Sequence, residues 1–233
     1  MNQQKICIIG NGLAGLITAV VLSEEDIKID LIFPKVKNFT TDYRTTAVSE
    51  TNFNFLKKEL NLKNPKYIWP SKKIDLFYQK KENFYKFLNF EEKNKIYMHI
   101  FRNSDLRKTL IKIIKKKKNI KIIRETVTKI NYEKSSVFLK NKNITYNLII
   151  LCLGNKSQLY NTVIDGRSIE KNYKEVAITS LVNHNFVIEN ASQFFLKEGP
   201  FAILPLKKNL FSIVWSVNEK FFLENKTNLN NLL

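Results

Sequence analysis

Three glycines near the start of the chain have the spacing of a phosphate-binding loop. In the run ICIIGNGLAG, Gly10, Gly12 and Gly15 follow apolar residues and open onto a second apolar run, LITAVVL. Gly10 would permit a tight turn, Gly12 would let the backbone approach a pyrophosphate, and Gly15 would let a helix pack close to a strand. Together with Leu13 and Ala14, at the N-terminus of that helix, they are candidates to bind a dinucleotide. The alternative is a strand–helix turn that holds no ligand.

The strand expected at 27–33 lacks the residue that usually accompanies such a loop. The second strand of a dinucleotide-binding unit normally ends in Asp or Glu, which accepts a hydrogen bond from a ribose hydroxyl. Phe33 stands at that end here, and no arginine takes its place to indicate a ribose 2′-phosphate. Phe33 therefore argues against a plain nicotinamide-dependent dehydrogenase, and it should also weaken the adenosine contacts of a flavin.

The remaining pattern predicts the elements that would position this loop. A strand at 5–9, a helix at 13–22 and the strand at 27–33 form one βαβ unit, and "NLIILCLG" is typical of a strand buried on both faces. A polar loop is expected at 38–46. Further elements are expected as helices at 49–60 and 103–118, a hairpin within 72–90, strands at 120–123 and within 126–152, strands at 175–182, 192–195, 201–206 and 211–217, and a helix-like start at the C-terminal end.

Composition excludes several classes of protein. The net charge is +18, but the lysines are scattered and the arginines are few, so we do not expect nucleic-acid binding. Neither an N-terminal leader nor a membrane-spanning run is evident. The two cysteines, Cys7 and Cys152, lie in apolar runs and are expected to be buried free thiols, with a shared disulfide as the alternative. No spacing of cysteines and histidines predicts a metal site.

Downstream segments resemble one known family. The chain is similar to the FAD-dependent aromatic hydroxylases, a flavoprotein monooxygenase family, and most of all to the ubiquinone-biosynthesis branch, which hydroxylates polyprenyl phenols. The resemblance runs through the chain in the family's order. It is carried by GNGLAG, DYRTTAVSETNFNFLKKEL (42–60), FRNSDLRKTL (101–110), LCLGNKS (151–157), KEGPFAILPL (197–206) and FSIVW (211–215).

The resemblance implies further residues that would bind FAD. Arg44 would reach the flavin from the loop before its helix, with Asp42 bracing it; a solvated loop arginine is the alternative. Asn103 would make a polar contact at the start of the next helix, or merely cap it. Val127 and Gly154 complete the implied set, and Gly154 has the alternative role of a strand-end turn. No catalytic residue is implied, because the cofactor supplies the chemistry.

The chain departs from the family in three places. Phe33 replaces the ribose acid, and Leu153 replaces the aspartate of the fingerprint that retains Gly154 and Ser157. The sequence also ends before the family's later Gly-Asp motif, which meets the flavin ring. We therefore expect the chain to be the N-terminal part of a longer protein, with a naturally short, degenerate copy as the alternative.

The resemblance implies an α/β fold, with a Rossmann-like FAD-binding lobe (1–66 and 98–157) interleaved with a β-rich substrate lobe (67–97 and 158–233). The implied activity is an FAD- and NAD(P)H-dependent monooxygenase that uses O2 to hydroxylate a polyprenyl phenol. It would be cytoplasmic, with contacts to the inner membrane or to a ubiquinone-biosynthesis complex, and this chain alone would be inactive. The alternatives are a non-catalytic remnant that retains at most nucleotide binding, and a nicotinamide-dependent reductase built on the same lobe.

Overall fold

The computed structural model describes residues 3–35, 42–63, 65–154, 157, 159–160 and 171–228, which form two compact units that alternate along the chain. Unit 1 comprises 1–41 and 104–170, and unit 2 comprises 42–103 and 171–233. The two lobes expected from the sequence, 1–66 with 98–157 and 67–97 with 158–233, have other bounds and stay a prediction. The assignment of one part to FAD and the other to the substrate stays a prediction. Among the described residues, no helix is both long enough and apolar enough to cross a membrane.

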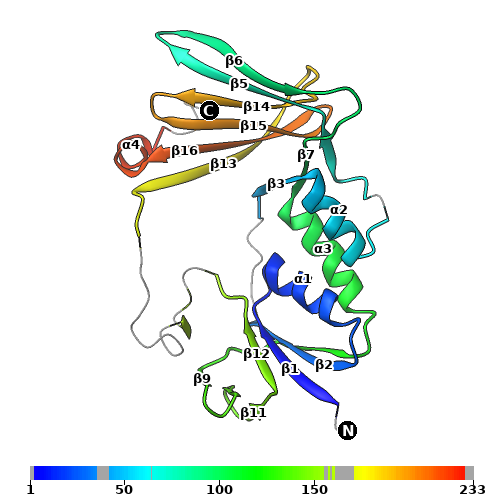
Figure 1. Ribbon diagram of the computed structural model, residues 1–233. Helices are drawn as coiled ribbons and strands as arrows, with labels where there is room; N and C mark the ends of the chain where they lie inside the picture. The colour runs from blue at the N-terminus through cyan, green and yellow to red at the C-terminus, as the bar shows by residue number, and fades with distance from the viewer. Residues whose placement is uncertain are drawn as a thin grey trace. The chain divides into compact units, whose positions relative to one another are not determined.

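Unit 1 is built on a four-stranded parallel sheet with the strand order β12-β1-β2-β8 (Figure 1). Its strands are β1 (Gln4–Ile9), β2 (Ile27–Ile32), β8 (Ile120–Ile123) and β12 (Leu148–Leu151). The helices α1 (Leu13–Leu22) and α3 (Asn103–Ile114) accompany this sheet, and α3 begins at the last residue of unit 2. Because the strands run parallel, the carboxyl ends of β1, β2 and β8 meet at one edge, where open α/β sheets bind ligands.

A small antiparallel sheet completes unit 1. It contains β9 (Lys129–Asn131), β10 (Ser136–Phe138) and β11 (Asn143–Thr145), in the order β11-β10-β9. Its apolar side chains form one buried cluster with side chains from β1, β2 and β8. The cluster contains Cys7, Ile9, Ile32, Ile123, Val127, Ile130, Val137, Leu139 and Tyr146.

Unit 2 is dominated by a six-stranded sheet with the order β13-β16-β15-β14-β5-β6 (Figure 1). Its strands are β5 (Lys73–Lys80), β6 (Asn83–Glu91), β13 (Glu175–Asn183), β14 (Ala191–Leu196), β15 (Gly199–Lys207) and β16 (Leu210–Asn218). The helix α4 (Glu219–Asn225) follows β16. Unit 2 also contains α2 (Glu50–Glu59) and a three-stranded sheet of β3 (Thr45–Ser49), β4 (Trp69–Ser71) and β7 (Met98–Arg102), in the order β3-β7-β4.

Two sequence expectations need correction. Residues 45 and 46, expected in a loop, begin β3, because they pair with β7 in an antiparallel ladder. The helix expected to reach residue 118 ends at Ile114, and the lysines that follow it lie in a turn and a short coil before β8. The α/β class, the first βαβ unit and the hairpin of β5 and β6 agree with the prediction.

A candidate nucleotide-binding site at the glycine loop

The glycine loop, Gly10–Gly15, joins β1 to α1, and two of its glycines are required by the protein itself. Gly10 has φ +128°, and a Cβ there would lie 2.1 Å from the Cys152 carbonyl oxygen. A Cβ on Gly15 would lie 2.4 Å from the Gly10 carbonyl oxygen. Both distances are shorter than real Cβ contacts, so Gly10 allows the turn and Gly15 allows α1 to approach the loop, as the sequence predicted.

Gly12 differs from these two, because no protein atom explains why it is a glycine. Its backbone is extended, with φ −70° and ψ 175°, which any residue can adopt. A Cβ built on it would meet nothing within 4 Å. The space in front of Gly12 is therefore open, and a phosphate group of a ligand could approach the loop there.

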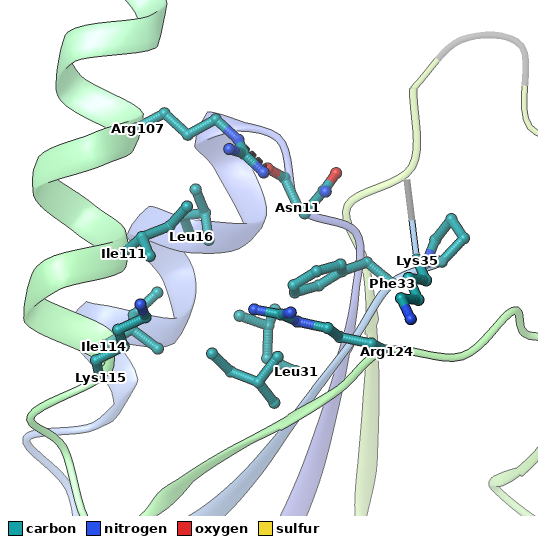
Figure 2. Close-up of a pocket in the computed structure, with 12 residues that line it drawn as sticks. Asn11, Leu16, Leu31, Phe33, Lys35, Arg107, Ile111, Ile114, Lys115 and Arg124 are labelled. Atoms are coloured by element: carbon teal, nitrogen blue, oxygen red, sulfur yellow. Dashed lines mark hydrogen bonds between the residues drawn. The ribbon is translucent and has the colours of Figure 1, made fainter. Parts of the chain in front are cut away.

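The start of α1 presents polar groups to the same space. Gly12 is the N-cap and has no side chain to bond the first amides of the helix, and the first turn carries no acidic residue. The amides of Leu13, Ala14 and Gly15 thus belong to the group of helix N-terminal donors that favour an anion. Arg107, on α3, donates from Nε to the Asn11 carbonyl oxygen at 3.3 Å, which fixes a guanidinium beside the loop (Figure 2).

A cavity of about 150 Å³ lies next to the glycine loop, at the carboxyl ends of the strands (Figure 2). Its apolar lining comes from both helices, from paired positions on β2 and β8, and from the two residues that follow β2. Its polar lining comes from Asn11 and from four cationic side chains. The lining residues are Asn11, Leu16, Leu31, Phe33, Pro34, Lys35, Arg107, Ile111, Ile114, Lys115, Ile122 and Arg124.

Phe33 and Arg124 share one end of this cavity. The pairing of β2 with β8 aligns Ile32 with Ile123, and the Phe33 amide donates to the Ile123 carbonyl oxygen at 3.1 Å. Arg124, directly after Ile123, therefore lies beside Phe33, and its side chain extends into the cavity (Figure 2). Arg124 could not be expected at this position from the sequence, because it is distant along the chain and only the strand order brings it there.

Arg44 and Asn103 lie together in unit 2. The Asn103 amide donates to the Arg44 carbonyl oxygen at 3.0 Å, and the Asn103 side chain accepts from the Thr46 hydroxyl at 2.5 Å. Arg44 forms a two-point ion pair with Asp42, with distances of 2.8 and 2.9 Å, and this pair raises the pKa of the Arg44 guanidinium. The bracing role expected for Asp42 is thus present in the structure, while 72% of the Arg44 side chain remains exposed.

Val127, Leu153 and Gly154 belong to unit 1. The Val127 side chain is buried in the apolar cluster, and Leu153 packs against the same cluster. The Val127 side chain is therefore not available to a ligand, and Leu153, in place of the fingerprint aspartate, makes apolar contacts. A Cβ on Gly154 would meet nothing within 4 Å, as at Gly12. Asn155 and Lys156 of the same motif lie outside the described residues.

A buried polar network supports the sheet beneath the loop. Asp30, on β2, accepts a hydrogen bond from the Tyr146 hydroxyl and a charged contact from Lys5 Nζ, both at 2.8 Å. Burial, reinforced by Asp30, raises the pKa of the Cys7 thiol to about 12. Cys7 and Cys152 are both free thiols, and Cys152 is only half-buried, with a pKa that partial burial also raises. Cys7 and Tyr146 also belong to the apolar core cluster of unit 1.

Comparison with solved structures identifies the fold that surrounds this site. PqsL of Pseudomonas aeruginosa, described as a probable FAD-dependent monooxygenase, superposes with a TM-score of 0.76 at 12% identity, over 96% of this chain and 63% of that one. The chain has the fold of an FAD-dependent monooxygenase. A tryptophan halogenase from Shewanella frigidimarina shares it (TM-score 0.75, 14% identity, 99% of this chain and 59% of that one).

A third structure with this fold is 2-methyl-3-hydroxypyridine-5-carboxylic acid oxygenase, with a TM-score of 0.71 at 14% identity over 94% of this chain and 60% of that one. The chain thus spans about three fifths of the length of these proteins. No family model matches the sequence. No curated protein matches it either.

The described residues fit one part of FAD better than another. The open space over Gly12, the first amides of α1 and Arg107 fit a pyrophosphate. The ribose end does not show the acid that this type of site normally uses, since Phe33 and Arg124 stand there instead.

Proposed function

We propose that the chain is the nucleotide-binding and substrate-binding part of an FAD-dependent oxidoreductase of the aromatic-hydroxylase type. The observation that carries this proposal is Gly12, whose missing side chain leaves open a space that no protein atom fills. That space lies at the N-terminus of a helix, at the ligand-binding edge of a parallel sheet, in a fold shared with an FAD-dependent monooxygenase.

In this proposal the chain's own residues hold and orient the cofactor. The amides at the start of α1 and the Arg107 guanidinium bind the pyrophosphate, and the backbone around Val127 borders the adenosine. Arg44, Asn103 and Gly154 remain proposed contacts to the flavin, as the resemblance implies. FAD, when bound, would supply O2 activation after reduction by NAD(P)H.

An apolar substrate is supported by one surface of unit 2, which we call the aromatic face. It consists of Tyr78 on β5, Tyr85 and Phe87 on β6, and Phe195 on β14, whose ring centroids are linked at 5.5–6.0 Å. These side chains are 41–52% exposed, so they are not core residues.

A cluster of exposed aromatic rings favours binding of an apolar partner, because the contact removes apolar surface of both from water. A polyprenyl phenol would fit such a surface, and so would a peripheral contact with a membrane, where Tyr side chains and lysines are well tolerated. We retain the polyprenyl phenol of ubiquinone biosynthesis as the proposed substrate class.

Equilibrium dialysis with FAD tests the proposal. The wild-type chain should bind FAD measurably but weakly, because Phe33 removes a polar partner of the ribose. Gly12→Val should abolish binding, because its side chain fills the space over the loop. Equal FAD retention by the wild type and a folded Gly12→Val variant would refute the phosphate-binding role of the loop.

The second candidate is a non-catalytic protein that retains nucleotide binding. Leu153 favours it, because the side chain that replaces the fingerprint aspartate is packed against the core and offers no polar contact. Incubation of the chain with FAD, NADPH, O2 and a prenyl phenol tests the non-catalytic candidate. Hydroxylated product above a protein-free control would exclude it. FAD binding without product agrees with both candidates, because the chain spans about three fifths of the length of the proteins that share its fold.

A further inference from the structure

We propose that the cavity beside the glycine loop prefers an adenine nucleotide with an additional phosphate on its ribose, of the kind found in NADPH, over one without it. The inference rests on the nucleotide-binding part of the proposed function, because it concerns the adenosine end of the same site. It goes beyond that function in naming what this end selects.

The polar side chains that line the cavity are mostly positively charged. Four cationic side chains line it, namely Lys35, Arg107, Lys115 and Arg124, and none of its described lining residues is acidic. Binding sites for the adenosine of FAD or NAD normally contain an acid at the ribose. A cavity with several cations and no acid in its described lining instead suits a ligand with more negative charge than a pyrophosphate alone.

The positions of these cations also favour a second anionic group. Arg107 is fixed to the Asn11 carbonyl at the glycine loop, so it and the amides of α1 already serve a pyrophosphate. Lys35 and Arg124 instead follow β2 and β8, near Phe33, which occupies the strand-end position where a ribose acid is expected (Figure 2). They are therefore placed for a second anionic group at the ribose.

Phe33 is compatible with a phosphate on the ribose. A carboxylate at this position would attract Arg124 and repel a ribose phosphate, whereas a phenylalanine does neither. The acid that follows Arg124 in sequence, Glu125, is engaged elsewhere, since its Oε1 contacts Lys142 Nζ at 2.7 Å. An arginine can bind phosphate through two parallel N–H donors, which makes Arg124 suited to the task. The apolar lining from Leu16, Leu31 and Ile114 offers the adenine a surface.

One consequence is competition between two dinucleotides. FAD lacks the additional phosphate on its adenosine ribose and would bind through the loop without using Lys35 and Arg124. NADPH carries one and would use both, so NADPH should displace FAD from this pocket more effectively than NADH does.

The test is isothermal titration calorimetry of the chain with three nucleotides: 5′-ADP, adenosine 2′,5′-bisphosphate and adenosine 3′,5′-bisphosphate. We expect a bisphosphate to bind at least about tenfold more tightly than 5′-ADP in low salt, with the ratio falling as salt rises. Tighter binding of the 2′ isomer assigns an NADPH-type ligand, and tighter binding of the 3′ isomer assigns a coenzyme A-type ligand. Equal affinities for all three overturn the inference.

Substitutions at the two cations test whether they cause the preference for a ribose phosphate. Arg124→Gln and Lys35→Gln should each reduce the ratio of bisphosphate to 5′-ADP affinity, and the double variant should abolish it. Lys121→Gln changes an exposed lysine on β8, the strand that Arg124 follows; it is the matched control and should leave the ratio unchanged. Phe33→Glu should reverse the preference. A ratio unaffected by the Arg124 and Lys35 variants would overturn the assignment.

A parallel FAD titration separates this inference from the proposed function. If FAD binds while the bisphosphates and 5′-ADP bind equally, the proposed function stands and the ribose phosphate preference is wrong. If a bisphosphate binds tightly and FAD does not bind, the preference stands and the FAD-dependent function is wrong. Absence of binding by every nucleotide overturns both.

Discussion

Two substitutions in the glycine loop should have different effects on protein stability and on nucleotide binding. Gly12→Ala should leave the free energy of unfolding almost unchanged but weaken nucleotide binding, whereas Gly15→Ala should destabilise the fold. Both changes add one methyl group to the same loop, so each variant is a control for the other. The contrast follows from what a Cβ would meet at each position: nothing within 4 Å at Gly12, and the Gly10 carbonyl oxygen at 2.4 Å at Gly15.

The expected magnitudes follow from the structure. At Gly15 the added carbon forces α1 away from the loop, which costs about 1–3 kcal/mol as overpacking and is only partly offset by the higher helix propensity of alanine, about 1 kcal/mol. At Gly12, alanine is a poorer N-cap than glycine, but it also reduces the entropy of the unfolded chain. These two terms are each about 0.5–1 kcal/mol and of opposite sign, so the net change should stay within about 0.5 kcal/mol.

Urea denaturation followed by circular dichroism measures the first quantity, and titration with 5′-ADP measures the second. We expect the affinity of folded Gly12→Ala to fall at least about tenfold, because the methyl group occupies the space in which the pyrophosphate would lie. If Gly12→Ala loses as much stability as Gly15→Ala, Gly12 has a structural role that we have missed. If its affinity equals that of the wild type, no ligand approaches Gly12 and the loop has been misassigned.

Three further predictions concern other parts of the chain. Tyr146→Phe should lower the free energy of unfolding by about 1–3 kcal/mol in a denaturant titration, since it removes a hydrogen bond to the buried Asp30; an unchanged midpoint would contradict this. Above pH 9, where the unfolded thiol ionises but Cys7 with its pKa of about 12 does not, stability should fall by up to about 1.4 kcal/mol per pH unit. Cys7→Ala should flatten that slope, and an identical slope in both proteins would show that other groups cause it. Phe87→Ser should reduce co-sedimentation with anionic lipid vesicles more than Phe55→Ser, an exposed aromatic on α2, and equal loss would exclude the aromatic face as the contact.

The elements of the fold could be predicted where local sequence determines them. The βαβ unit around the glycine loop and the aromatic hairpin follow from apolar periodicity and from glycine placement, which act within a few residues. The boundaries of β3 could not be predicted, because residues 45 and 46 are polar and their extended conformation comes from pairing with β7. Long-range pairing of this kind leaves little trace in local sequence.

Only the part of the site that local sequence determines could be predicted. The spacing of Gly10, Gly12 and Gly15 indicated the loop, but Arg124 joined the site only through the order of the parallel strands. Placing β8 beside β2 brings Arg124 next to Phe33, and a single sequence does not specify that neighbour. The signal that could have revealed it is the position of Arg124 directly after a predicted strand, since carboxyl ends of parallel strands gather at the ligand edge.

The central claim, that the glycine loop and the adjoining cavity bind an adenine nucleotide, is tested most directly by nuclear magnetic resonance. The amide spectrum of the isotopically labelled chain would be recorded during titration with adenosine 2′,5′-bisphosphate, which also detects weak binding. We predict concentration-dependent shifts concentrated at Gly10, Gly12, Gly15, Phe33 and Arg124. Shifts at Lys121, on the strand that Arg124 follows, should be small. A spectrum that does not change, or shifts confined to residues away from the loop and cavity, would contradict the account.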